Sequence, residues 1–301
     1  MLTLEYLADL CDQYRTAAKA QVKEFSLAGH PFAFNSHPAI MGVVNLSADS
    51  WYRESVCLSA GSAIRRAQVL RAQGADLVDI GAESTLAHAA RVPGEAQQGK
   101  LLPVIRGLRE QGILVSAETY DVGVARACLE AGANALNLTG TEASAELFRM
   151  VAQHDAAVII CYIQGKNVRE VGDFYLSSDP INVLHDFFAR QIELANRNGV
   201  EKLFLDPGLG FYYRNLQDSG QRVRHQMQVF LNTFRLRSLG YPICHALPHA
   251  FEFFREDVRC AEPFFALLAA LGKTDCFRTH EVSRVRAVLD TLNVFSPPDE
   301  E

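Results

Sequence analysis

Carboxylate and amide side chains stand near the ends of three short apolar stretches. Glu118 lies in the stretch 113–119, Asn137 in 135–138, and Asp206 at the end of 202–206. The carboxyl ends of buried parallel strands are where an α/β fold gathers its chemistry. Two carboxylates and an amide meeting there suit a ligand edge that carries several hydrogen-bond donors beside a carbonyl. The simpler alternative is that the carboxylates cap helices, or that Asp206 shapes a turn before Pro207 and Gly208.

A second group of side chains suits an anion. Arg278 follows Cys276 and Phe277 inside an apolar stretch, which argues against an ordinary surface arginine, and His280 comes two residues later. A guanidinium and an imidazole side by side can neutralise an anionic leaving group. The alternative for His280 is that it caps the last helix.

The elements that must position these residues alternate regularly along the chain. Nearly continuous apolar runs such as 158–160 are typical of parallel strands buried on both faces, and eight strand–helix units predict a (β/α)8 TIM barrel. A doubly wound open sheet is the alternative. The expected strands are 39–46, 77–81, 113–119, 135–138, 157–163, 202–206, 242–246 and 276–280. The expected helices are 60–73, 97–111, 121–132, 142–154, 179–198, 220–239, 258–272 and 281–294.

An additional amphipathic helix is expected over residues 3–23, where apolar side chains recur at three- and four-residue spacing. It would plug the floor of the barrel or pack on a partner. We therefore divide the chain into an N-terminal helical extension (1–30), a barrel (31–296) and an acidic tail (297–301) that frays.

The composition is that of a folded globular protein. Of 301 residues, 49% are hydrophobic and 21% charged, and the net charge of -6 argues against a nucleic-acid partner. Seven cysteines without a C-x-x-C pair fit neither a disulfide framework nor a zinc ribbon and indicate free thiols in a reducing compartment. We expect no secretory signal, no membrane span and a cytoplasmic location.

Four motifs at the expected strand ends resemble those of dihydropteroate synthase. They are Ile40-Met41-Gly42-Val43-Val44-Asn45, Asp79-Ile80-Gly81-Ala82-Glu83-Ser84-Thr85, Asp206-Pro207-Gly208-Leu209-Gly210-Phe211 and Arg278-Thr279-His280-Glu281-Val282. The resemblance runs from about residue 38 to residue 295, and it implies a pterin-binding barrel that acts as a transferase in folate-type metabolism.

The resemblance also implies a role for each matching residue. The residues that would bind the pterin are Glu118, Asn137, Ile163, Asp206 and Phe211. The residues that would hold the diphosphate of the substrate are Asn45, Thr85, Arg278 and His280, with Asn45 as a ligand of Mg²⁺. Catalysis would fall to Asn45, His249, Arg278 and His280. The implied partner is a small-molecule pterin, and the implied assembly is a homodimer.

The chain departs from the family pattern at the acceptor end. Leu86 stands where an arginine is usual, and no lysine occurs between Lys202 and Lys273, so the lysine that follows the seventh strand is missing and Ala250 takes its position. His249, when protonated, would replace it in part. The aromatic pair Tyr212 and Tyr213 is expected to narrow or reshape the acceptor pocket, and the alternative is that these tyrosines are exposed lids on a loop. We therefore expect condensation with p-aminobenzoate to be slow or absent while pterin binding persists.

Two other functions fit the same residues. A methyltransferase that takes its methyl group from methyltetrahydrofolate uses similar Asp and Asn positions and needs no acceptor lysine, although it has no use for the anion-site arginine. A pterin-binding paralogue without catalysis is the other alternative. Cys161, Cys244 and His245 could form a thiol–imidazole metal site, but buried cysteines are usually small hydrophobes.

Overall fold

The computed structural model describes residues 1–50, 52–85, 89–141, 144–211, 213, 215–216 and 218–295. Eight parallel strands within these residues form one sheet, in the order β8-β7-β6-β5-β4-β3-β10-β9. Their bounds are β3 Ala39–Asn45, β4 Leu77–Gly81, β5 Val115–Thr119, β6 Ala135–Leu138, β7 Ala157–Cys161, β8 Leu203–Asp206, β9 Cys244–Ala246 and β10 Cys276–Thr279. A parallel bridge between Leu205 and Ile243 joins the two outer strands. The (β/α)8 TIM barrel is therefore confirmed, and the open sheet is wrong.

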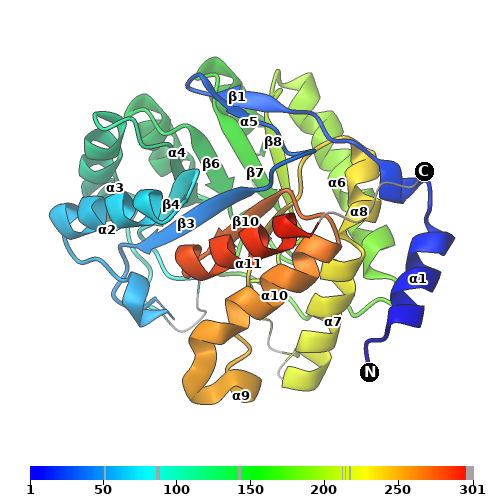
Figure 1. Ribbon diagram of the computed structural model, residues 1–301. Helices are drawn as coiled ribbons and strands as arrows, with labels where there is room; N and C mark the ends of the chain where they lie inside the picture. The colour runs from blue at the N-terminus through cyan, green and yellow to red at the C-terminus, as the bar shows by residue number, and fades with distance from the viewer. Residues whose placement is uncertain are drawn as a thin grey trace.

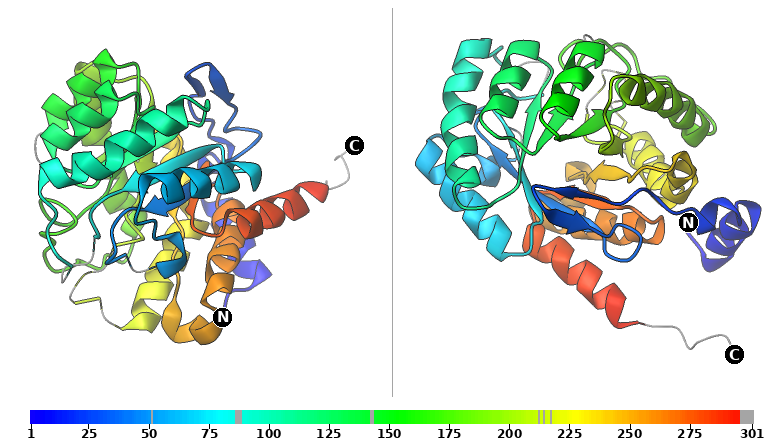
Figure 2. Two further views of the ribbon diagram at one scale, coloured as in Figure 1. Left: turned by 90° about the vertical axis from the view of Figure 1, so that its left-hand side faces the viewer. Right: turned by 90° about the horizontal axis from the view of Figure 1, so that it is seen from above.

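Helices surround the strands as an outer ring (Figures 1 and 2). They are α2 Ala60–Ala72, α3 Gly94–Arg109, α4 Val122–Glu130, α5 Ser144–Gln153, α6 Pro180–Arg197, α7 Ser219–Leu231, α8 Thr233–Leu236, α9 Phe251–Phe254, α10 Ala261–Leu271 and α11 Val282–Val294. Capping side chains determine where several of these helices begin. The Asp121 carboxylate accepts a hydrogen bond from the Val124 N–H at 2.8 Å at the start of α4, and Asp179 before Pro180 caps α6.

The N-terminal segment differs from the expected helix. Helix α1 (Leu4–Gln13) ends ten residues before the predicted end at 23, and a hairpin of β1 (Phe25–Leu27) and β2 (His30–Phe32) follows. The hairpin, and not the helix, covers the floor of the barrel (Figure 2), where Phe25 packs edge-on against Phe204 of β8 with ring centroids 5.2 Å apart. Helix α1 lies outside the barrel with Leu7 and Leu10 half-buried against the core.

The hairpin crosses the boundary at residue 30 between the extension and the barrel, and the acidic tail lies outside the described residues. The domain division thus stays a prediction. In the described part of the chain, no helix has both the length and the apolar character needed to cross a membrane.

Candidate functional site

A pocket lies at the carboxyl ends of the barrel strands, and most of the predicted site residues line it. They are Asn45, Thr85, Glu118, Asn137, Asp206, Phe211, His249, Arg278 and His280. Ile163 is the exception, because it is buried in the hydrophobic cluster inside the barrel and does not line the pocket. The structure therefore brings nine of the ten predicted residues together, while their roles stay predictions.

A network of charged groups forms the bottom of the pocket. Arg278 donates from Nε to the Asp79 Oδ2 at 2.8 Å and from Nη2 to the Glu118 Oε2 at 2.7 Å. The Asn137 amide donates to the same Asp79 oxygen at 3.0 Å, and the Cys161 thiol donates to the Asn137 Oδ1 at 3.3 Å. Strand register explains the convergence, since Glu118 lies opposite Asn137 on β6 and opposite Gly81 on β4, two residues after Asp79.

This network carries more negative than positive charge. Asp79, Glu118 and Asp206 are three buried or nearly buried acids. Among the described residues, Arg278 is the one cation bonded to any of them, and it bonds Asp79 and Glu118. Burial, countered by Arg278 and reinforced by Asp79, raises the pKa of Glu118 to about 7. Burial likewise raises the pKa of Asp206 to about 6. Burial alone would lower the pKa of Arg278, but the charges of Asp79 and Glu118 hold it above its ordinary value.

The loop after β8 holds Asp206 in place. The Gly208 N–H donates to the Asp206 Oδ1 at 2.8 Å. Gly208 has a φ of +76°, and a Cβ at this position would lie 2.1 Å from the Tyr162 carbonyl oxygen. Only glycine fits such a close approach with a left-handed backbone, so the Pro-Gly sequence serves to turn an amide toward the carboxylate.

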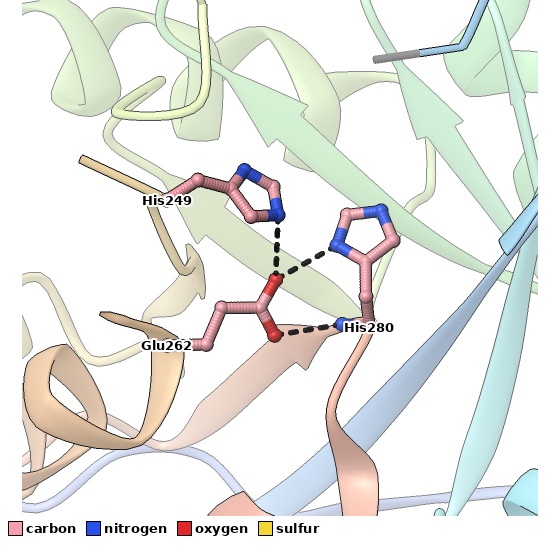
Figure 3. Close-up of side chains that lie close together, drawn as sticks. All are labelled: His249, Glu262 and His280. Atoms are coloured by element: carbon pink, nitrogen blue, oxygen red, sulfur yellow. Dashed lines mark hydrogen bonds and ion pairs between the residues drawn. The ribbon is translucent and has the colours of Figure 1, made fainter. Parts of the chain in front are cut away.

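A second cluster lies at the rim, between the ends of β9 and β10 (Figure 3). The Glu262 carboxylate, from the first turn of α10, lies 3.1 Å from the His249 Nε2 and 2.8 Å from the His280 Nδ1. The Tyr52 ring stacks on both imidazoles, with centroids 4.9 and 4.6 Å away, and its hydroxyl donates to Glu281. Burial opposes ionisation of Glu262, yet His280 and His249 hold its pKa well below the usual range.

Three comparisons with known proteins identify the family and the fold of the chain. Residues 41–247 match the family model described as pterin binding enzyme, which is more than half of the chain. The chain belongs to the pterin binding enzyme family. Dihydropteroate synthase from Synechocystis sp. is 29% identical over 221 residues, which cover 70% of this chain and 72% of that protein.

Solved structures of family members share the barrel. A Xanthomonas albilineans dihydropteroate synthase with 4-aminobenzoic acid is 26% identical, with a TM-score of 0.76, and the match covers 91% of this chain and 98% of that one. The same enzyme in complex with 7,8-dihydropteroate gives 25% identity and a TM-score of 0.73, over 90% of this chain and 98% of that one.

The acceptor end of this family member differs from the sequence-based expectation. Tyr213 is buried, its hydroxyl accepts a hydrogen bond from the Gln164 N–H at 3.2 Å, and it does not line the pocket. The prediction that Tyr213 narrows the pocket is therefore wrong, while Leu86 and Tyr212 lie outside the described residues. Ala250, at the lysine position, is buried with a φ of 44°. A positive charge from Arg222 does line the pocket, bonded to Glu252 at 2.7 Å.

Among the described residues, the structure does not place Cys161, Cys244 and His245 together as metal ligands. Cys161 bonds Asn137, whereas the His245 Nε2 shares a 2.8 Å hydrogen bond with the Thr233 hydroxyl. Over the described ranges, the one group of three or more histidine, cysteine and acidic side chains placed to hold a metal is His249, Glu262 and His280.

Sequence reasoning missed Asp79, Glu262 and Tyr52 as members of the site. Asp79 had a signal, because it is a charged residue in the middle of an entirely buried strand. Glu262 had one as well, since it is the single charged residue in Ala261–Leu271. The position of Tyr52, in an irregular loop after β3, carries no comparable signal.

Proposed function

We propose that this chain is a pterin-binding transferase that activates a 6-hydroxymethyl-dihydropterin diphosphate. Its membership of the family and the buried excess of acidic groups in the pocket support the proposal. The observation that carries it is Asp206, a buried carboxylate that lines the pocket and has no salt bridge to any residue that the structure describes. A buried carboxylate without a cationic partner is costly unless a ligand supplies hydrogen-bond donors.

A pterin supplies the missing donors. Its amino-pyrimidine edge carries several N–H groups beside a carbonyl, and Glu118, Asp206 and Asn137 present two carboxylates and an amide within one pocket. The Asp206 carboxylate, whose pKa is about 6, is charged at neutral pH. Charge-assisted bonds from ring N–H groups to such a carboxylate are about twice as strong as neutral ones.

The reaction breaks the bond between the exocyclic methylene carbon and the diphosphate oxygen. The bonding electrons leave with the diphosphate, and the pterin methylene cation that remains is captured by a nucleophile, which then loses a proton. Buried carboxylates near the ring stabilise that positive charge as it develops. At the other end, Thr85, His280 and Arg278 line the part of the pocket assigned to the anion. Arg278 would share its guanidinium between this anion and the carboxylates that it already bonds.

Mg²⁺ would accompany the diphosphate, and the donor chemistry of Asn45 fits it. The Asn45 amide nitrogen donates to the Ser55 hydroxyl at 2.6 Å, which leaves the amide oxygen as the atom available to a hard cation. Bound Mg²⁺ would neutralise charge on the leaving diphosphate. Asn45 itself, held by Ser55, would orient that end of the substrate.

The acceptor end of the pocket is expected to be a poor match for p-aminobenzoate. No lysine lies between β9 and Lys273, and the Ala250 side chain at the expected lysine position carries no charge. A missing positive charge beside the reaction centre commonly costs several kcal/mol of transition-state stabilisation, roughly a thousandfold in rate. Condensation with p-aminobenzoate would therefore be slow while pterin binding is retained.

The test measures binding and diphosphate release separately. The protein is titrated with the dihydropterin diphosphate and Mg²⁺, with and without p-aminobenzoate, alongside Asp206→Asn and the exposed control Asp290→Asn. Release that depends on Asp206 and not on Asp290 supports the proposal. Binding without release indicates a non-catalytic paralogue. Binding of methyltetrahydrofolate alone indicates a methyltransferase, and no binding of any pterin overturns the proposal.

A further inference from the structure

Two imidazoles at the rim of the pocket face a single carboxylate oxygen. The Glu262 Oε1 lies 3.1 Å from the His249 Nε2 and 2.8 Å from the His280 Nδ1, and these three atoms all lie within 4.8 Å of one another (Figure 3). The three side chains come from different elements: the segment after β9, the start of α10 and the end of β10. Their convergence is thus a property of the barrel and not of one local turn.

The His249 nitrogen is buried without a hydrogen bond. His249 is 8% exposed, and its Nε2 has no hydrogen-bond partner in the described structure, even though Glu262 lies close by. The contact is close enough for an ion pair but lacks hydrogen-bond geometry. This buried imidazole nitrogen is therefore paired with Glu262 by charge without a well-formed hydrogen bond, and its lone pair can take a cation as a further partner.

The spacing matches the ligand shell of a small cation. Zinc lies about 2.0 to 2.2 Å from histidine nitrogen and carboxylate oxygen, so neighbouring ligand atoms are about 2.8 to 3.5 Å apart for bond angles between 90° and tetrahedral. The distances of 2.8 and 3.1 Å from the Glu262 Oε1 to the two imidazole nitrogens lie within this range. An ion bound by all three atoms would take the place of the present contacts between the imidazoles and the carboxylate.

Neighbouring groups hold the three ligands in this arrangement. The other carboxylate oxygen of Glu262 accepts hydrogen bonds from the Thr279 hydroxyl, from the His280 N–H at 2.9 Å and from the Glu281 N–H at 3.1 Å. These bonds leave Oε1 to face the imidazoles. The Tyr52 ring stacks on both imidazoles and fixes their planes. Outer contacts of this kind orient ligands in metal sites.

We propose that His249, Glu262 and His280 form a binding site for a divalent transition metal, for which Zn²⁺ is the best-matched ion. Two imidazoles and one carboxylate are the donor set of open zinc sites, whereas Mg²⁺ prefers oxygen ligands alone. Because His249 and His280 both line the pocket, the remaining coordination positions face it and would take water or an anionic oxygen. This site is separate from the Mg²⁺ position at Asn45, and it does not depend on pterin binding.

Metal binding alone tests the proposal. Exposed cysteines also bind zinc, so Cys11 and Cys260 are first replaced by serine. The full chain, freed of metal with a chelator, is then titrated with ZnCl₂ by calorimetry, and retained zinc is counted after gel filtration. We expect one Zn²⁺ per chain, an affinity at least 100-fold lower in His249→Ala, and no change in His185→Ala, which removes an exposed imidazole.

Two further measurements keep the test decisive. Glu262→Gln is expected to weaken zinc binding as His249→Ala does. Circular dichroism reports whether Glu262→Gln folds, and if it does not, the test rests on His249→Ala. Co²⁺ in place of Zn²⁺ should give ligand-field bands that His249→Ala abolishes. The proposal is overturned if the serine variant retains no zinc, if His249→Ala binds it equally well, or if Mg²⁺ binds as tightly as Zn²⁺.

Discussion

Replacing Asp206 by asparagine should make the protein more stable while it loses its ligand. The pKa of Asp206 is about 6 in the folded chain, against an ordinary value of 3.8, and burial is the main cause. This rise corresponds to about 3 kcal/mol. Asparagine removes the buried charge and keeps an oxygen that can accept the Gly208 N–H. Arg278 loses part of its electrostatic support in the variant, so we expect a gain of about 1 to 3 kcal/mol at pH 8.

The sign follows from proton linkage. Between pH 4 and pH 6 the folded chain holds the Asp206 proton more tightly than the unfolded chain does, so this group's contribution to the free energy of unfolding falls as the pH rises through that window. The loss is complete above about pH 6. The advantage of Asp206→Asn should therefore be full at pH 8 and shrink as the pH falls toward 4.

Thermal and urea unfolding at several pH values measure this advantage, which at pH 8 should appear as a rise in Tm of about 2 to 6 °C. In parallel, pterin affinity should fall by about 10- to 150-fold, because a charge-assisted bond is worth about 1.5 to 3 kcal/mol. Asp290→Asn, on the exposed face of α11, should change neither quantity. The reasoning would be refuted if Asp206→Asn were less stable than the parent at pH 8, or if the difference in stability between the two did not change with pH.

Two other substitutions probe the same network. Gly208→Ala should lower the free energy of unfolding by about 3 kcal/mol or more, since its Cβ would lie 2.1 Å from the Tyr162 carbonyl oxygen, and urea titration measures this; an unchanged midpoint would contradict it. Arg278→Met should cost about 3 to 5 kcal/mol in the same assay, because it leaves two buried carboxylates unpaired. Near-wild-type stability would show that the pocket acids are protonated together in the unliganded protein.

The positions of the site residues were largely predictable, because topology decides them. Parallel strands in a barrel end at one mouth, so Glu118, Asn137, Asp206 and Arg278 had to meet once the eight units were recognised. Which atoms bond which was not predictable. The pairing of Arg278 with Asp79 depends on β10 lying beside β3 and β3 beside β4, which is a relation between the last strand and the first two.

The N-terminal hairpin could not be predicted from the sequence, for a different reason. Its two-residue turn has Ala28 at a φ of 46° and Gly29 at 81°. Such turns favour asparagine or glycine at both central positions, so an alanine hides the signal. The helical spacing of the preceding residues was then extended too far, to residue 23. Only packing against the barrel floor, with Phe25 on Phe204, selects the hairpin over a longer helix.

The pocket bottom and its rim meet the same problem of buried negative charge in different ways. At the rim, Glu262 has two imidazoles and three hydrogen-bond donors around it, and its pKa is well below the usual range. At the bottom, three acids share one guanidinium, and burial raises the pKa of both Glu118 and Asp206. A fold selected for stability alone would not retain such an imbalance, since each uncompensated carboxylate destabilises the folded chain. The imbalance is explained if a donor-rich ligand supplies the missing positive edge, and it would also favour a cation forming on that ligand when the diphosphate departs.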